Sequence, residues 1–268
     1  MNLARKCRPE SFANVRLATT VLLFAAALLM PVSASAEDDA KQILKKMSDY
    51  LAAETSFSAT FDSDIEVITT ELEKIQFTSS GSMQVSRPGK IHARRTGGYN
   101  DVELFLDGKT LTVVNKDQNA YAQASAPDSI DKTVDLLRND FSAEVPGADL
   151  ILSNVYDALS EDVLEAKHVG DGVINGVECD HLAFRNEDTD WQLWVQKGDK
   201  PIPRKYVITS KAVAGAPEYT LIIKDWNEGG VPGDAFAFSP PADAKKVDFK
   251  ELKEMDEVPA GTVIGGSQ

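Results

Sequence analysis

An alternation of apolar and polar residues with a period of two is the feature that most constrains this fold. One parity of the segment 57–67 is largely apolar and contains Phe57, Ala59, Phe61, Ile65 and Val67. The same alternation returns across residues 75–93. A period of two is typical of β-strands that bury one face and expose the other to water. The sequence therefore predicts antiparallel strands as the main element of the fold.

A turn signal separates two of these predicted strands. In Arg87-Pro88-Gly89-Lys90, proline at the second position and glycine at the third are typical of a type II turn. Residues on both sides of the turn alternate between apolar and polar, as two paired strands require. The segment 81–95 is therefore predicted to be a β-hairpin, and its basic residues are interpreted first as a solvated rim.

Apolar residues repeat with a helical period in two other parts of the chain. Near the start, one stripe consists of Ile43, Leu44, Met47, Tyr50 and Leu51. Midway, residues 127–141 and 148–160 each carry a narrow apolar stripe, and Asp128 is the expected N-cap of the first of these helices. Narrow stripes fit helices that lie on a sheet. We therefore expect an N-terminal helix and a helical lid over the sheet.

The remaining segments complete a single β-rich domain. Strand-like runs recur between residues 101 and 125 and again between 163 and 223, for a total of about eleven antiparallel strands. With the helices, this predicts an α+β fold whose sheet curls on itself or is covered by the lid. We expect the domain to span residues 37–249, and residues 250–268 to form a polar, disordered tail.

The first 36 residues have the features of a signal peptide. Four basic residues precede the apolar run 17–30, which is short for a membrane span, and Ala34-Ser35-Ala36 matches a cleavage site. Cys7 precedes the apolar run, whereas a lipid-modified cysteine would follow it. We expect export to the periplasm, cleavage after Ala36 and no stable membrane anchor in the mature protein; an uncleaved anchor is the alternative.

Charge and cysteine content exclude several classes of function. The chain carries 28 basic and 42 acidic residues, a formal net charge of −14 at pH 7, and loss of residues 1–36 makes it more negative. Such a surface repels nucleic acid and anionic lipid headgroups, so we expect no nucleic-acid partner. Cys179 is the single cysteine after Ala36, so no internal disulfide is expected.

Catalytic and metal-binding patterns are weak. Cys179 and His181 lie two residues apart, which places both side chains on one face of a strand, and a hydrolase around this pair is the least favoured function. Two aspartate pairs have spacings found in metal sites but lack the glycine and distal glutamate of a calcium loop: Asp62/Asp64 and Asp188/Asp190. They are interpreted as solvated carboxylates. No catalytic residue, metal or cofactor is predicted.

Several short motifs resemble, in their order along the chain, those of the LolA-like periplasmic lipoprotein carriers. They are SFSATF (56–61), GSMQVSRPGKI (81–91), LFLDGKTLTVVN (104–115) and FAFSPP (236–241). Residues 176–209 are similar to a family of the same superfamily, DUF2092. The resemblance implies an incomplete antiparallel β-barrel, closed by helices around an apolar cavity, in a periplasmic protein that handles acyl chains. The functional arginine of the carriers corresponds by motif to Arg87, and Met83 stands where the carriers have tryptophan.

The leading hypothesis is a non-enzymatic periplasmic protein that binds an apolar ligand, a lipid or a lipoprotein acyl chain, in the half-barrel cavity. The residues expected to contact the ligand are Phe57, Phe61, Phe77, Met83, Val85, Arg87 and Leu104. Because Arg87 begins a turn, we expect it to act on the ligand and not on the fold. The alternative is an interaction module that recruits a periplasmic or outer-membrane protein by strand addition at a sheet edge.

Overall fold

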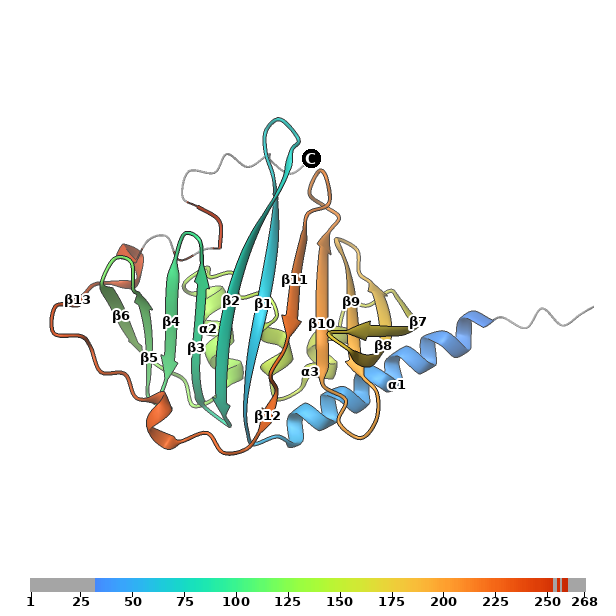
Figure 1. Cartoon of the computed structure of the whole chain (residues 1–268), viewed down its shortest axis with the longest axis horizontal. Coiled ribbons are helices and arrows are strands. Elements are labelled where there is room, and N and C mark those ends of the chain that lie inside the picture. The colour runs from blue at the N-terminus through green and yellow to red at the C-terminus, as the bar shows by residue number, and fades with distance from the viewer. Residues whose placement is uncertain (1–31, 253–254, 256, 260–268) are drawn as a thin grey trace, which may run out of the picture. The chain divides into compact units, whose positions relative to one another are not determined.

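The computed structural model describes residues 32–252, 255 and 257–259, and a single β-sheet dominates them (Figure 1). The strands in this part of the chain are β1 (Ser56–Ile68), β2 (Lys74–Ser86), β3 (Lys90–Gly97), β4 (Asp101–Leu106), β5 (Thr110–Asn115), β6 (Ala120–Ser125), β7 (Glu165–Ile174), β8 (Val177–Arg185), β9 (Thr189–Gln196), β10 (Pro203–Ser210), β11 (Glu218–Ile223), β12 (Asn227–Glu228) and β13 (Lys245–Lys246). The helices are α1 (Val32–Ala53), α2 (Ile130–Asn139) and α3 (Val155–Ser160), and the 3-10 turns are η1 (Ala148–Ile151), η2 (Gly233–Phe236) and η3 (Phe249–Glu251).

The sheet is antiparallel and does not close on itself. Its strand order is β13-β6-β5-β4-β3-β2-β1-β11-β10-β9-β8-β7, with β12 beside β1, and only the short β13–β6 pair is parallel among the described strands. The chain leaves β1 on one side through β2 to β6 and returns on the other through β7 to β11. β1–β11 therefore match the eleven predicted strands, and the α+β fold with an incomplete barrel is confirmed. β12 and β13 add two residues each.

Helices cover one face of the sheet, which we call the inner face. On one half, Leu44, Met47 and Leu51 of α1 pack with Val155 and Leu159 of α3 against β7–β11. On the other half, α2 packs against β2–β5. Both contacts use the apolar stripes predicted from the helical period. The apolar side chains that α2 buries there are Ile130, Val134 and Leu137.

Local details differ from the sequence-based predictions at two helix positions. Ser129, and not Asp128, is the N-cap of α2: its hydroxyl accepts a hydrogen bond from the backbone N–H of Lys132 at 3.3 Å. Asp128 instead pairs with the ammonium of Lys132 at 2.8 Å. The second predicted helix, 148–160, is split into η1 and α3, because Asn154 caps a new helix with its own side chain.

The turn after β2 also differs from the prediction. Gly89 lacks the positive φ angle that the third position of a type II turn requires, and the Arg87–Pro88 peptide bond is cis. The predicted type II turn is therefore wrong, although the hairpin it joins is present with Val85 opposite Ile91.

Parts of both predicted terminal segments lie outside the described residues. Residues 1–31, most of the predicted signal peptide, lie outside the described residues, and Val32–Ala36 are the first residues of α1. In the predicted tail, residues 253–254, 256 and 260–268 lie outside them as well. No helix within the described part of the chain has both the length and the apolar character that crossing a membrane requires.

Candidate ligand-binding groove

A groove of about 1230 Å³ lies between the inner face of the sheet and the segments that cover it. Its walls are formed by the end of α2, the loop 140–146 and described residues of the C-terminal segment from Asp248 onward. The side chains that form its floor come from β1, β3, β4, β5 and β11 and are Phe61, Ala93, Val102, Leu104, Val113 and Tyr219. This volume exceeds the ~300–1,000 Å³ of most small-molecule pockets.

The apolar floor follows from the alternation of the strands and from their register. Ala93 lies opposite Leu104, and Leu104 lies opposite Val113, so one row of apolar side chains crosses three adjacent strands. Residues that are directly opposite in an antiparallel pair share a face. The sheet therefore converts three separate period-two patterns into one continuous apolar surface.

Gly81 on β2 makes space for the ring of Phe61, which lines the groove. It lies opposite Phe61 on one side and Arg95 on the other. A β-carbon at this position would lie 2.3 Å from the ring of Phe61 and 2.5 Å from the carbonyl oxygen of Arg94. The ring of Phe61 therefore occupies the volume that any other residue at position 81 would need.

A small polar group interrupts the apolar floor. Ser63, which is fully buried, donates a hydrogen bond to the carboxylate of Glu257 at 2.9 Å. Nη1 of Arg95 lies 3.4 Å from the other oxygen of the same carboxylate, and Nη2 donates to the carbonyl of Met255. Burial raises the pKa of the neighbouring Tyr219, and the charge of Glu257 raises it further. Glu257 is only 8% exposed, so this carboxylate is held inside the protein.

Apolar residues of the C-terminal segment occupy part of the groove beside this polar group. Phe249, Leu252 and Met255 pack against the core that α2 shares with the sheet. The ring of Phe249 stacks on that of Phe141, with 4.2 Å between centroids. These described residues of the segment therefore fill space that would otherwise open on the floor.

The structure brings only some of the sequence-predicted ligand residues to this groove. Phe61 and Leu104 line it. Phe57, Met83 and Val85 belong to the packed core beneath α2, where the ring of Phe57 stacks on Trp226 with 4.5 Å between centroids. Phe77 instead meets the ring of Tyr99 edge-on at 5.5 Å. Ligand contact by any of the seven predicted residues stays a prediction.

Sequence reasoning missed Ser63, Arg95, Tyr219 and Glu257. A signal was present for two of them, since Ser63 has the parity of the apolar Phe61 and Arg95 has the parity of Ile91. A polar residue at a position that alternation assigns to a buried face needs a partner. Nothing in the local sequence indicates that this partner is Glu257, 162 residues after Arg95.

Arg87 contacts backbone and not the groove floor. Its guanidinium donates to the carbonyls of Glu54 at 3.2 Å, Ile151 at 2.9 Å and Leu152 at 3.3 Å. These carbonyls belong to the residue after α1 and to η1 and the residue that follows it. Burial of the guanidinium lowers the pKa of Arg87, whereas the nearby charge of Asp131 raises it. The side chain therefore joins the β2–β3 turn to two covering segments.

Cys179 and His181 each have other partners. The thiol of Cys179 is fully buried and donates to the carbonyl of Val177 at 3.4 Å. Burial raises the pKa of this thiol, which disfavours the nucleophilic thiolate. The imidazole of His181 bonds to Gln192 at 2.9 Å and stacks on Trp194 at 4.0 Å between centroids.

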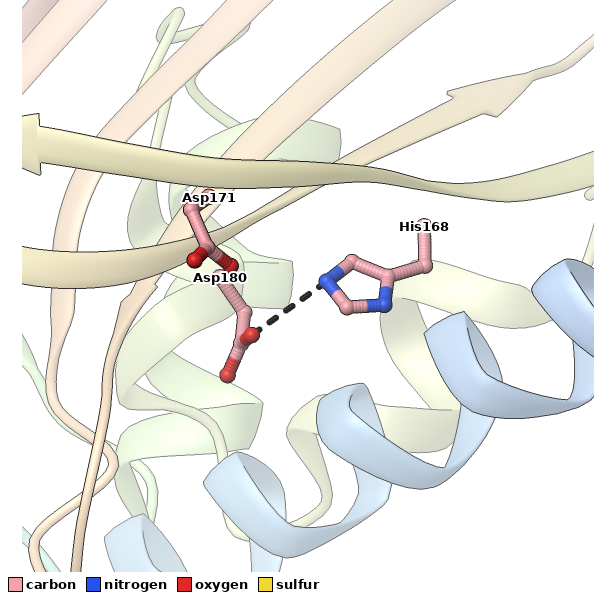
Figure 2. Close-up of side chains that lie close together, drawn as sticks. All are labelled: His168, Asp171 and Asp180. Atoms are coloured by element: carbon pink, nitrogen blue, oxygen red, sulfur yellow. Dashed lines mark ion pairs between the residues drawn. The ribbon is translucent and has the colours of Figure 1, made fainter.

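A second polar cluster lies on β7 and β8, where His168, Asp171 and Asp180 point toward one another (Figure 2). Their ligand atoms lie within 4.8 Å of one another, with His168 Nε2 at 3.2 Å from Asp180. The ammonium of Lys197 lies 2.5 Å from Asp171 and 3.6 Å from Asp180. Its hydrogen bond lowers the pKa of Asp171, whose side chain is 80% exposed. Lys197 thus supplies the positive charge that these carboxylates require, and the cluster is a surface ion-pair network.

Three solved structures are similar to this chain at low sequence identity. Mycobacterium tuberculosis lipoprotein LppX is 13% identical with a TM-score of 0.46, over 73% of this chain and 98% of that one. A LolA superfamily protein from Nitrosomonas europaea is 12% identical with a TM-score of 0.36, over 74% and 97%. A chain of the Pseudomonas aeruginosa MucA/MucB complex is 15% identical with a TM-score of 0.40, over 72% and 58%. No curated protein matches the chain.

A family model matches a larger share of the chain than these three structures do. Residues 40–250 match the model described as "Predicted periplasmic protein (DUF2092)", which covers every strand of the sheet and the groove floor with Phe61 and Arg95. Glu257 lies beyond the matched residues. The similarity of residues 176–209 to DUF2092 is confirmed, and the chain belongs to the DUF2092 family of predicted periplasmic proteins.

Proposed function

We propose that this protein is a non-enzymatic periplasmic protein that binds an acyl chain in the groove between the sheet and its covering segments. One observation carries the proposal: an apolar floor contributed by five strands lines a groove of about 1230 Å³. A floor that was needed only for folding would be filled by the covering helices. Here α2 reaches it mainly with Leu137, and the space beyond is left to the loop and the C-terminal segment.

An apolar groove of this kind gives useful affinity without a catalytic group. Burial of one methylene contributes about 0.8 kcal/mol, so a 16-carbon chain offers on the order of 10 kcal/mol before the cost of ordering it. The buried, weakly acidic thiol of Cys179 supports binding over hydrolysis as the function of the domain.

Titration with the neutral fluorescent probe Nile red tests the proposal. We expect the folded wild type to bind the probe and Phe61→Asp to lose most of this binding, because an ionised carboxylate on an apolar floor costs several kcal/mol. Phe105→Asp is the matched control: Phe105 alternates with the floor residue Leu104 along β4 and stacks on His92 on the other face.

Circular dichroism would confirm that both variants are folded. A wild type that binds no probe contradicts the proposal, as does equal binding by Phe61→Asp and wild type.

The β7 edge of the sheet, beside which α1 lies, supports the alternative, recruitment of a protein by strand addition, less well. β7 is the last strand of its side, and it exposes Val169 by 52% and Val173 by 65%. The other exposed positions of this strand include three charged residues, namely Glu165, Lys167 and Asp171. Charges on an edge strand are a common device against pairing with another chain.

A further inference from the structure

We infer that the groove binds its acyl ligand by a terminal carboxylate, in a site formed by Arg95 and Ser63. The inference rests on the proposed function and specifies the class of ligand. In the structure, the chain's own Glu257 places a carboxylate in this site. The side chain of Glu257 thus shows which chemical group the site accepts.

The arrangement of the C-terminal residues is that of an amphiphile. Phe249, Leu252 and Met255 lie on apolar surface, and the carboxylate of Glu257 meets the hydroxyl of Ser63 and the guanidinium of Arg95. A fatty acid presents the same sequence of groups, an apolar chain that ends in a carboxylate. Such a ligand would replace Glu257 at the polar group and the three apolar side chains on the floor.

The polar group has unused capacity for an anion. Nε of Arg95 is buried and makes no hydrogen bond within the described residues, and Nη1 is 3.4 Å from Glu257, which is long for a charged pair. A free carboxylate is not restrained by the backbone, so it can approach the guanidinium in the bidentate geometry that arginine favours.

Two other basic residues line the groove, and neither replaces Arg95. Lys250 is exposed, so solvent and salt screen its charge. Arg94 is the preceding residue, but its guanidinium is paired with Asp101 at 2.5 and 3.0 Å. Acidic residues do line the mouth, namely Asp140, Glu144, Asp248 and Glu251. All four are exposed, so solvent and salt screen their repulsion of an anionic ligand.

Isothermal titration of the whole domain with dodecanoate and with 1-dodecanol tests the inference. We expect Arg95→Met to weaken dodecanoate binding at least about tenfold and not to weaken dodecanol binding, since hydrogen bonds to a charged group are lost only for the acid. Arg94→Met removes the same charge one residue away and should change neither affinity. Glu257→Gln should strengthen dodecanoate binding about fivefold, because the internal competitor loses its charge.

The outcomes separate the two proposals. If wild type and Arg95→Met bind dodecanoate and dodecanol equally well, the carboxylate site is wrong while the apolar groove stands. A similar loss of both ligands in Arg95→Met also overturns the carboxylate site, because the change then acts on the groove as a whole. If the wild type binds neither ligand nor Nile red, the proposed function itself is wrong.

Discussion

Replacement of Arg87 by leucine distinguishes a structural role of this side chain from the ligand contact predicted by motif. The guanidinium donates three hydrogen bonds, to the carbonyls of Glu54, Ile151 and Leu152, at 2.9 to 3.3 Å. These bonds connect the β2–β3 turn to the end of α1 and to η1. Leucine cannot donate any of them, so we expect Arg87→Leu to destabilise the fold and not only to alter binding.

The size of the effect can be estimated from these contacts. A hydrogen bond from a charged donor contributes about 1.5–3 kcal/mol, and the two bonds longer than 3.1 Å contribute least. Leucine also relieves the desolvation of a buried guanidinium, which offsets part of the loss. The net cost is about 3 kcal/mol. For a domain of this size each kcal/mol lowers Tm by roughly 2–4 °C, so the expected decrease is about 6–12 °C.

Differential scanning calorimetry of the purified domain measures this decrease. Arg94→Leu is the control, because its partner Asp101 forms an exposed ion pair worth about 0–1 kcal/mol. A Tm of Arg87→Leu within about 2 °C of wild type would refute the structural role. If Nile red binding were then weakened at the same time, Arg87 would act on the ligand, as the motif suggests.

Three further changes test other parts of the structure. Gly81→Ala should cost about 1–3 kcal/mol in chemical denaturation and weaken Nile red binding, because its β-carbon displaces the ring of Phe61. Cys179→Ala should cost about 1 kcal/mol and leave probe binding unchanged; loss of binding in a folded protein would contradict a purely structural thiol. Burial opposes ionisation of Glu103, but its hydrogen bonds with Lys116 and His92 outweigh this and lower its pKa. The stabilisation by Glu103 is therefore complete above the unfolded pKa near 4.3 and is lost as the pH falls through the lower folded pKa. We expect Glu103→Gln to be less stable than wild type at pH 7 but to lose less stability on acidification. Parallel curves of stability against pH for the two proteins would refute this.

Much of the fold could be predicted because its determinants are local. The period of two along residues 57–67 assigns β1 and its buried face, and the narrow stripe of Ile130, Val134 and Leu137 assigns α2 as a helix that lies on a sheet. Register then follows from the hairpin around Pro88, since Val85 and Ile91 must share a face. These features depend on residues close together in the chain, and the alternation needs no knowledge of what covers it.

The parts that failed or were missed depend on contacts that the local sequence does not encode. Phe57 and Phe61 have the same parity, yet the ring of Phe57 is covered by Trp226 and that of Phe61 faces the groove. Alternation distinguishes the two faces of a strand but does not indicate which part of the inner face a helix will cover. The N-cap of α2 depended likewise on which of two adjacent side chains turned back to the helix.

The sequence by itself determined an acidic, β-rich protein, because composition and period act residue by residue. Only the tertiary structure decided that Arg95 and Ser63 meet Glu257, at separations of 162 and 194 residues. Whether a segment of the chain packs into a groove depends on the shape of that groove and on the unpaired polar groups in it, and several strands and helices together form both. The physical reason is that a buried guanidinium needs a partner close to it in space. Which residue lies close is fixed only after β1, β3 and the covering segments have come together.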